Sequence, residues 1–253
     1  MEKASIVVEN LKKSYSEKVV FSGLDLKIDH GSCYSLLGKN GVGKTTLINC
    51  MLDVIKPDSG RILINRMDYN SQSLKIKSLT GSVFENNPLI EEFTGENYLK
   101  FVGMLYKVAQ EELKHRIETI TDYFFPDGKD LQKNISEYST GMKKKLGVCA
   151  SVLHRPDILI LDEPFSGLDP VAAQMLIQFL NSYLSSDRII FLSSHDLAYV
   201  EKVSTHIGVL DEGALVYDGT LENFTMNGVN LLDQALLKLL KSDENNLRNI
   251  DWI

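Results

Sequence analysis

Residues 38–45 read GKNGVGKT, and this octapeptide decides the fold. It fits the pattern G-x-x-x-x-G-K-[ST], in which the glycines let the backbone wrap closely around a phosphate group. The apolar run CYSLL at 33–37 precedes it, and the run LINCML at 47–52 follows it. These runs predict a strand before the loop and a helix after it, which is the setting of a phosphate-binding loop. A flexible surface turn, the alternative, does not explain this setting.

The residue types of the loop predict how it holds a nucleotide. Inward-pointing backbone N–H groups and the positive end of the helix dipole favour phosphate oxygens. Lys44 supplies a point charge for the β- and γ-phosphates, and the Thr45 hydroxyl is a suitable ligand for Mg²⁺. We therefore expect ATP and Mg²⁺ to bind here. The predicted nucleotide-binding residues of the loop are Gly38, Asn40, Gly41, Gly43, Lys44, Thr45 and Thr46.

Two carboxylates, Asp162 and Glu163, directly follow the apolar run ILIL at 158–161. A run without polar alternation predicts a strand buried on both faces in the middle of a sheet. Because the carboxyl ends of parallel strands form the ligand edge, both acids should lie beside the phosphate loop. We expect Asp162 to hold the Mg²⁺ shell and Glu163 to act as general base on an attacking water. The alternative is a charged strand-to-loop transition without a chemical role.

Short apolar runs alternate with amphipathic helical stretches, which predicts an α/β fold with a mostly parallel sheet. The predicted strands are 5–9, 24–28, 33–37, 61–64, 158–161, 189–192 and 206–210. Strand signals stop between 85 and 155, where apolar residues recur at helical spacing.

We therefore predict a P-loop NTPase core with an antiparallel β region at its N-terminus and an inserted α-helical subdomain. The core takes 1–85 and 156–220, the helical subdomain 86–155, and a C-terminal helical tail 221–253. The tail has an apolar stripe between 232 and 240, which either packs on its own domain or contacts a partner.

Composition excludes several classes of protein. The formal net charge of −7 disfavours a non-specific nucleic-acid binder, whose domain would be basic, so no nucleic-acid partner is expected. The three cysteines lack the C-x-x-C spacing of zinc and redox sites and read as buried apolar residues of a cytosolic protein. No apolar run approaches the roughly 18 residues of a membrane span, so a partner must supply any membrane function.

Further motifs carry a family resemblance. The pentad YSTGM at 138–142 opens a helical stretch, SGLD at 166–169 follows the carboxylate pair, and a histidine stands in FLSSHD at 191–196. With the phosphate loop, these motifs resemble, in order and spacing, the ATP-binding subunit of an ABC (ATP-binding cassette) transporter, whose core is RecA-like. The resemblance runs from about residue 15 to residue 220.

The resemblance implies that the pentad completes the ATP site of an opposite subunit. Ser139 and the backbone of Gly141 stand at a helix start, where unpaired N–H donors and a positive dipole end favour a γ-phosphate. Two copies facing head to tail would share two ATP molecules, a closed C₂ arrangement. An ordinary N-cap is the alternative for Ser139.

The remaining positions carry over one at a time. Tyr15 matches the aromatic residue that stacks on adenine, with a core tyrosine as the alternative. His195 matches a histidine that contacts the γ-phosphate, with a solvated helix start as the alternative. Asp169 matches a loop that crosses between subunits, and a plain N-cap is its rival. The lysines at 143–145 most simply form a solvated helix face, with a phosphate or lipid role left open.

Two departures from the family pattern stand out. Glu85 follows GSVF where most relatives have glutamine, and an ionised glutamate only accepts hydrogen bonds. Glu85 could still reach Mg²⁺ through water. Tyr138, Thr140 and Met142 replace the common leucine, glycine and glutamine of the pentad. Both departures resemble the branch that exports drugs, antibiotics and polysaccharides.

The sequence thus predicts an ATPase that powers export through a separate transmembrane permease subunit and works as a pair of identical copies. We expect it on the inner face of the cell membrane, in the cytoplasm. Two alternatives remain open. One is a soluble cassette ATPase that acts on ribosomes or DNA, and the other is a regulatory nucleotide-binding module in which Glu85 weakens catalysis.

Overall fold

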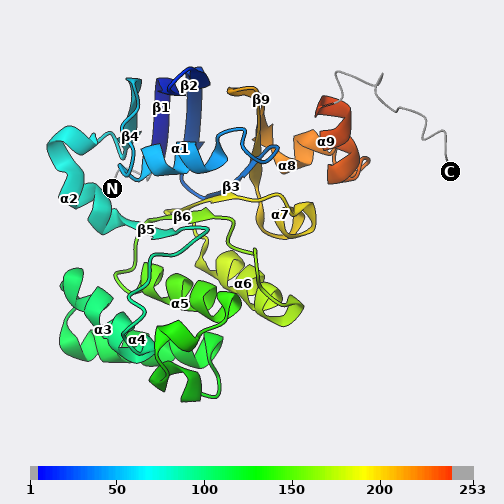
Figure 1. The fold of residues 1–253 in the computed structure, drawn as a ribbon. Coiled ribbons are helices and arrows are strands. Elements are labelled where there is room, and N and C mark those ends of the chain that lie inside the picture. Colours follow the sequence, from blue (N-terminus) through cyan, green and yellow to red (C-terminus); the bar gives the residue numbers. More distant parts are fainter. Residues whose placement is uncertain (1–4, 241–253) are drawn as a thin grey trace.

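The structure is a computed structural model that describes residues 5–240 and contains two β-sheets with helices packed against them (Figure 1). The larger sheet has the strand order β5-β6-β7-β3-β8-β9. Its strands are β3 (Ser32–Leu37), β5 (Thr80–Val83), β6 (Ile158–Asp162), β7 (Ile189–Ser193), β8 (His206–Asp211) and β9 (Ala214–Thr220). Strands β5, β6, β7, β3 and β8 run parallel to one another. Strand β9 pairs with β8 antiparallel. The predicted mostly parallel sheet is confirmed.

The smaller sheet has the order β2-β1-β4 and is antiparallel, as predicted for the N-terminal region. Its strands are β1 (Ser5–Tyr15), β2 (Lys18–Asp29) and β4 (Ser59–Ile64). Leu24, Leu26 and Ile28 alternate with exposed residues in β2, so one face of the sheet is apolar. That face packs on helix α1 (Lys44–Met51). Buried residues of α1 belong to one apolar cluster with this face and with residues of β6 and β7 in the larger sheet. Helix α1 is therefore held between the two sheets.

The opposite face of the larger sheet is covered by helices (Figure 1). These are α3 (Gly95–Leu105), α4 (Gln110–Phe124), α5 (Thr140–Val152) and α6 (Pro170–Tyr183), with short 3₁₀ turns at Lys129–Gln132 and Ile135–Glu137. Their buried residues form one cluster with Val83, Leu159 and Leu161. Helix α2 (Tyr69–Leu79) connects β4 to β5. Helix α3 lies in the region where apolar residues at helical spacing predicted helices, and its Leu99 is fully buried.

The seven predicted strands coincide with β1, β2, β3, β4, β6, β7 and β8. Every residue of β6 is buried, and β6 lies between β5 and β7, so the prediction of a central strand is confirmed. Strand β9 was not predicted. Its residues are only half-buried or exposed because it lies at the sheet edge, and its short apolar run, ALVY at 214–217, was not among the predicted strands.

The last described helices, α7 (Leu197–Val203), α8 (Leu221–Phe224) and α9 (Leu232–Leu240), surround a third apolar cluster. Leu232 is fully buried there, and Leu236 and Leu240 pack against it, so the stripe of the tail packs on its own domain. The end of the predicted tail, 241–253, lies outside the described residues. No helix within 5–240 is both long enough and apolar enough to cross a membrane.

Candidate nucleotide-binding site

The loop between β3 and α1 depends on glycine for its shape. Gly38 and Gly43 have φ angles of 155° and 121°, a region that side chains disfavour. A Cβ atom on Gly38 would lie 2.4 Å from the carbonyl oxygen of Leu210. Around Gly41, by contrast, a Cβ would meet no atom within 4 Å, because this residue faces the open side of the loop. The loop thus packs on β8 on one side and leaves its backbone accessible on the other.

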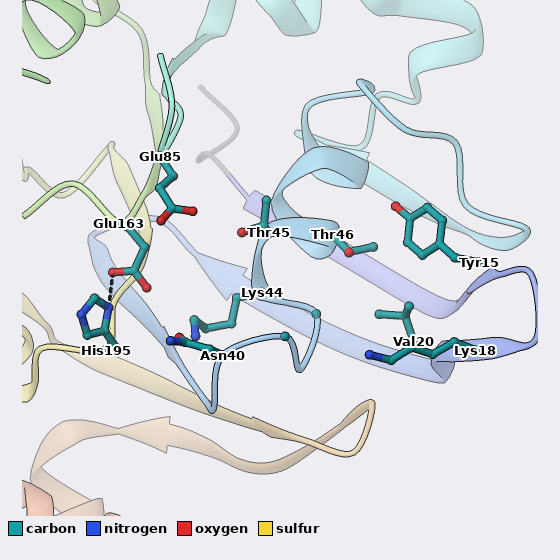
Figure 2. Close-up of a pocket in the computed structure, with 12 residues that line it drawn as sticks. Tyr15, Lys18, Val20, Asn40, Lys44, Thr45, Thr46, Glu85, Glu163 and His195 are labelled. Carbon is teal, nitrogen blue, oxygen red and sulfur yellow. Dashed lines mark hydrogen bonds and ion pairs between the residues drawn. The ribbon is translucent and has the colours of Figure 1, made fainter. Parts of the chain in front are cut away.

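A cavity of about 440 Å³ opens over this loop (Figure 2). Its volume suits a small-molecule ligand. The residues that line it are Tyr15, Lys18, Val20, Asn40, Gly41, Gly43, Lys44, Thr45, Thr46, Glu85, Glu163 and His195. In Figure 2, Glu85, Glu163 and His195 lie on one side and Tyr15 and Lys18 on the other. Ten of these twelve lining residues are predicted site residues, brought together from five parts of the chain.

Lys18 and Val20 were missed by the sequence analysis. Both come from the first residues of β2, which precede the predicted strand at 24–28. Val20 supports the loop, because its Cγ1 lies 2.8 Å from where a Cβ of Gly43 would stand. The contact between β2 and the loop depends on tertiary structure, so no local signal in the sequence could have found it.

Lys44 lies at the floor of the cavity and is 7% exposed. Its Nζ donates to the carbonyl oxygen of Gly38 at 2.7 Å. Burial lowers the pKa of Lys44, and the carboxylates of Glu163, Asp162 and Glu85 partly offset that effect. The loop therefore holds a cation directly beneath the place predicted for the phosphates.

Asp162, Glu163 and Ser193 form a connected group at the ends of β6 and β7. The Ser193 hydroxyl donates to Oδ1 of Asp162 at 2.5 Å and accepts from the backbone N–H of Glu163 at 3.0 Å. Asp162 is 1% exposed, and its Oδ2 has no hydrogen-bond partner. A buried carboxylate oxygen without a partner is costly unless a ligand satisfies it.

This unpaired oxygen fits the predicted Mg²⁺. Asp162 and the Thr45 hydroxyl offer only oxygen, which is what Mg²⁺ prefers, and protein sites for Mg²⁺ commonly use few side chains beside water and phosphate oxygens. Within the described residues there is no group of three or more His, Cys, Asp or Glu side chains that could hold a metal alone. The donor set therefore suits a cation that arrives with a nucleotide.

Glu163 turns back over the cavity immediately after β6. Its φ angle is 46°, which is strained for a residue with a side chain. Its Oε2 lies 2.9 Å from Nδ1 of His195, as the dashed line in Figure 2 marks. The Glu163 side chain is 9% exposed, whereas that of His195 is 59% exposed. His195 thus has a carboxylate partner in the cavity. The alternative, a histidine at a helix start that contacts only solvent, does not describe it.

Tyr15 stands at the end of β1 and is 45% exposed, which excludes the alternative of a core tyrosine. The Nζ of Lys13 lies 5.4 Å from the centre of its ring, a cation–π distance. The Tyr15 ring is held at the mouth of the cavity with a face available for stacking.

The structure does not bring Ser139, Gly141 and Asp169 into this cavity. Ser139 caps α5, with its Oγ accepting from the N–H of Met142, and Asp169 caps α6. A Cβ on Gly141 would lie 3.1 Å from the carbonyl oxygen of Gly167, so the starts of these helices are neighbours. The pentad and the SGLD loop form a second surface of their own.

The interpretation of 143–145 as a solvated face is wrong for Lys144. Lys144 is 3% exposed and its Nζ donates to three backbone carbonyls. Lys143 pairs with Glu91, and Lys145 donates to the carbonyl of Phe124. Successive helical residues point about 100° apart, so three in a row cannot all face solvent when the helix packs on a sheet.

Known proteins resemble this chain along most of its length. Residues 21–166 match the family model described as ABC transporter. The bacitracin transport ATP-binding protein BcrA of Enterococcus faecalis is 36% identical, over 83% of this chain and 68% of that protein. The Nod factor export ATP-binding protein I of Paraburkholderia xenovorans is 30% identical, over 87% and 72%.

A solved structure of the ATP binding subunit of an ABC transporter superposes with a TM-score of 0.85 and 28% identity, covering 93% of this chain and 99% of that one. The phosphate loop, the carboxylate pair and the fold thus agree with the match to the family model. The chain belongs to the ABC transporter family, as an ATP-binding subunit with ATPase activity.

Proposed function

We propose that this ATPase powers export as a pair of identical copies that close around two ATP molecules. The observation that carries the proposal is the division of the predicted site. The cavity holds the phosphate loop, Glu163 and His195, whereas the helix start at Ser139 and Gly141 lies on a different surface. Because the amides of a helix start favour phosphate, this second surface suits the ATP of another copy. A C₂ pair would then satisfy both sites at once.

Within each site, the residues divide the chemistry of hydrolysis. Oε1 of Glu163 accepts the proton of the water that attacks the γ-phosphate, and His195 holds the carboxylate through the contact of its Nδ1 with Oε2. Lys44 and the amides of the loop bind the phosphates. A bound Mg²⁺, held by Thr45 and Asp162, would neutralise phosphate charge. Glu85 faces the same space and would reach the ion through water. Asp169 lies in the loop that would cross to the partner copy.

The energy of closure would pass to a separate transmembrane permease. A second cavity of about 210 Å³ lies where the end of β5 meets α3 and α5, lined by Phe84, Asn87, Tyr98, Leu105 and Tyr106 among others. Leu105 is 63% exposed, and an exposed apolar side chain at such a groove suits a protein partner. The chain would therefore sit on the cytoplasmic face of the membrane, bound to the permease at this groove.

Export, rather than import, is supported by the resemblance of the pentad and by the relatives. The name of one of them, 30% identical to this chain, specifies Nod factor export. Purification of the chain from detergent-extracted membranes, followed by identification of a co-purifying multi-span protein, tests the permease. Loss of that protein on Leu105→Asp would support the groove, and its retention would contradict it.

Glu163→Gln tests the chemistry. The variant should bind ATP with unchanged affinity, lose at least about 100-fold in kcat because the general base is removed, and accumulate as an ATP-bound dimer. Steady-state phosphate release and size-exclusion chromatography with ATP measure these effects. The control is Glu118→Gln, an exposed glutamate of α4, which should behave as the parent chain. Near-normal turnover of Glu163→Gln would remove Glu163 from the role of base.

A further inference from the structure

Lys144 is a buried cation that the proposed mechanism does not use. It lies in the second turn of α5, the helix capped by Ser139, and is 3% exposed. A buried lysine is expensive unless its charge and its hydrogen bonds are satisfied. Its surroundings therefore indicate what it does.

The ammonium group of Lys144 joins two neighbouring strand ends. It donates to the carbonyl oxygens of Phe84 and Glu85, at 3.3 and 3.0 Å, and of Glu163, at 3.1 Å. A lysine has three N–H donors, so all of them are used. Phe84 and Glu85 follow β5, and Glu163 follows β6, which pairs with β5. One side chain thus ties both segments to α5.

The charge of Lys144 has partners too. Burial lowers its pKa, while Glu85, Asp162 and Glu163, in that order, favour its charged form. Lys44 faces the same three carboxylates from the phosphate loop. Asp162 ends β6 and Glu163 follows it, so this cation lies next to the end of β6.

We propose that Lys144 is a positioning residue, which fixes the backbone of Glu163 and Glu85 to the helix that begins at Ser139. The inference rests on the proposed function, in which Glu163 is the base and Ser139 meets the ATP of a second copy. Lys144 then links a subunit's own catalytic carboxylate to the helix start that serves its partner. A shift of α5 on closure moves the carbonyl of Glu163 with it.

The test replaces Lys144 by methionine, which has a similar shape but neither charge nor donors. Lys144→Met should lower kcat at least about tenfold while KM for ATP changes less than about twofold, because Tyr15 and the phosphate loop are untouched. The matched control is Lys145→Met, one residue along α5, which also loses a lysine–carbonyl bond but faces Phe124. Equal kcat values for the two variants would overturn the inference, as would a change confined to KM.

If Lys144→Met does not fold by circular dichroism, Lys144→Gln, which removes the charge and one of the three donors, takes its place. It should also lower kcat with KM nearly unchanged, and a kcat equal to that of the parent chain would overturn the inference.

The parent chain and Glu163→Gln are measured alongside. If Glu163→Gln loses turnover and Lys144→Met does not, the inference about Lys144 fails and the proposed function stands. If Glu163→Gln retains turnover, the proposed base fails. In that case, a fall of kcat in Lys144→Met alone would still support a positioning role at this end of β6.

Discussion

At the residue scale, we predict that the exposed ring of Tyr15 contributes to ATP affinity and not to the chemical step. It stands at the mouth of the cavity, apart from Glu163 and His195 (Figure 2). Tyr15→Ala should raise KM for ATP about 3- to 10-fold with kcat nearly unchanged, since an aromatic contact is worth about 0.5–1.5 kcal/mol. Steady-state kinetics measures both. Tyr15→Phe keeps the ring and should match the parent chain, and a fall in kcat with constant KM would exclude the stacking role.

Single residues differ in how far the sequence predicts them. The positions of Gly38, Gly43 and Lys44 could be predicted because the loop is a local structure with fixed spacing. Lys144 could not, because its burial follows from how α5 is rotated against the ends of β5 and β6. A run of like charges in the sequence carries no information about that rotation.

At the scale of elements, the ends of β6 and β7 are joined by the hydroxyl of Ser193, which is fully buried. Ser193→Ala would leave the N–H of Glu163 without its partner and remove a donor from Asp162. We expect the free energy of unfolding to fall by about 1–3 kcal/mol, the cost of unpaired buried groups. Urea denaturation measures it. Ser182→Ala, an exposed serine of α6, should change stability far less, and equal losses would show that the network adds nothing.

Strands buried on both faces were predictable because burial leaves a continuous apolar run, as in β6 and β7. Strand β9 was missed although it carries the short apolar run ALVY at 214–217, and it lies at the sheet edge with its residues half-buried or exposed. The strand order also could not be predicted, since β3 pairs with β7 and β8 across more than a hundred residues. The pairing of β6 with β7, which places Asp162 opposite Ser193, brings His195 beside Glu163.

At the scale of the whole molecule, the phosphate loop and the start of α5 lie on separate surfaces. The proposed pair therefore predicts that two differently damaged copies complement each other. Lys44→Ala damages the loop and Gly141→Asp damages the helix start. In a mixed pair, one site would inherit both defects and the other neither. Each variant alone should be inactive, and an equal mixture should recover up to about a quarter of parental turnover if subunits exchange at random.

Phosphate release at a series of mixing ratios measures this recovery. The control is a mixture of Lys44→Ala with Lys44→Met, which share one defect and should stay inactive. A mixture of Lys44→Ala with Gly141→Asp that also stays inactive, although both variants form dimers, would contradict the shared site. The motifs alone could not predict that the phosphate loop and the start of α5 lie on separate surfaces. This separation depends on the packing of α5 and α6 against the sheet.

The three cysteines, Cys33, Cys50 and Cys149, are all unpaired and buried in the apolar clusters. Burial raises the pKa of Cys33 to about 12 and that of Cys50 to about 11, so almost none of either is thiolate at neutral pH. Maleimides and disulfide-forming reagents should therefore leave the native chain untouched. A pair of cysteines engineered across the two surfaces could then report the approach of one copy to another by cross-linking, with no background to remove first.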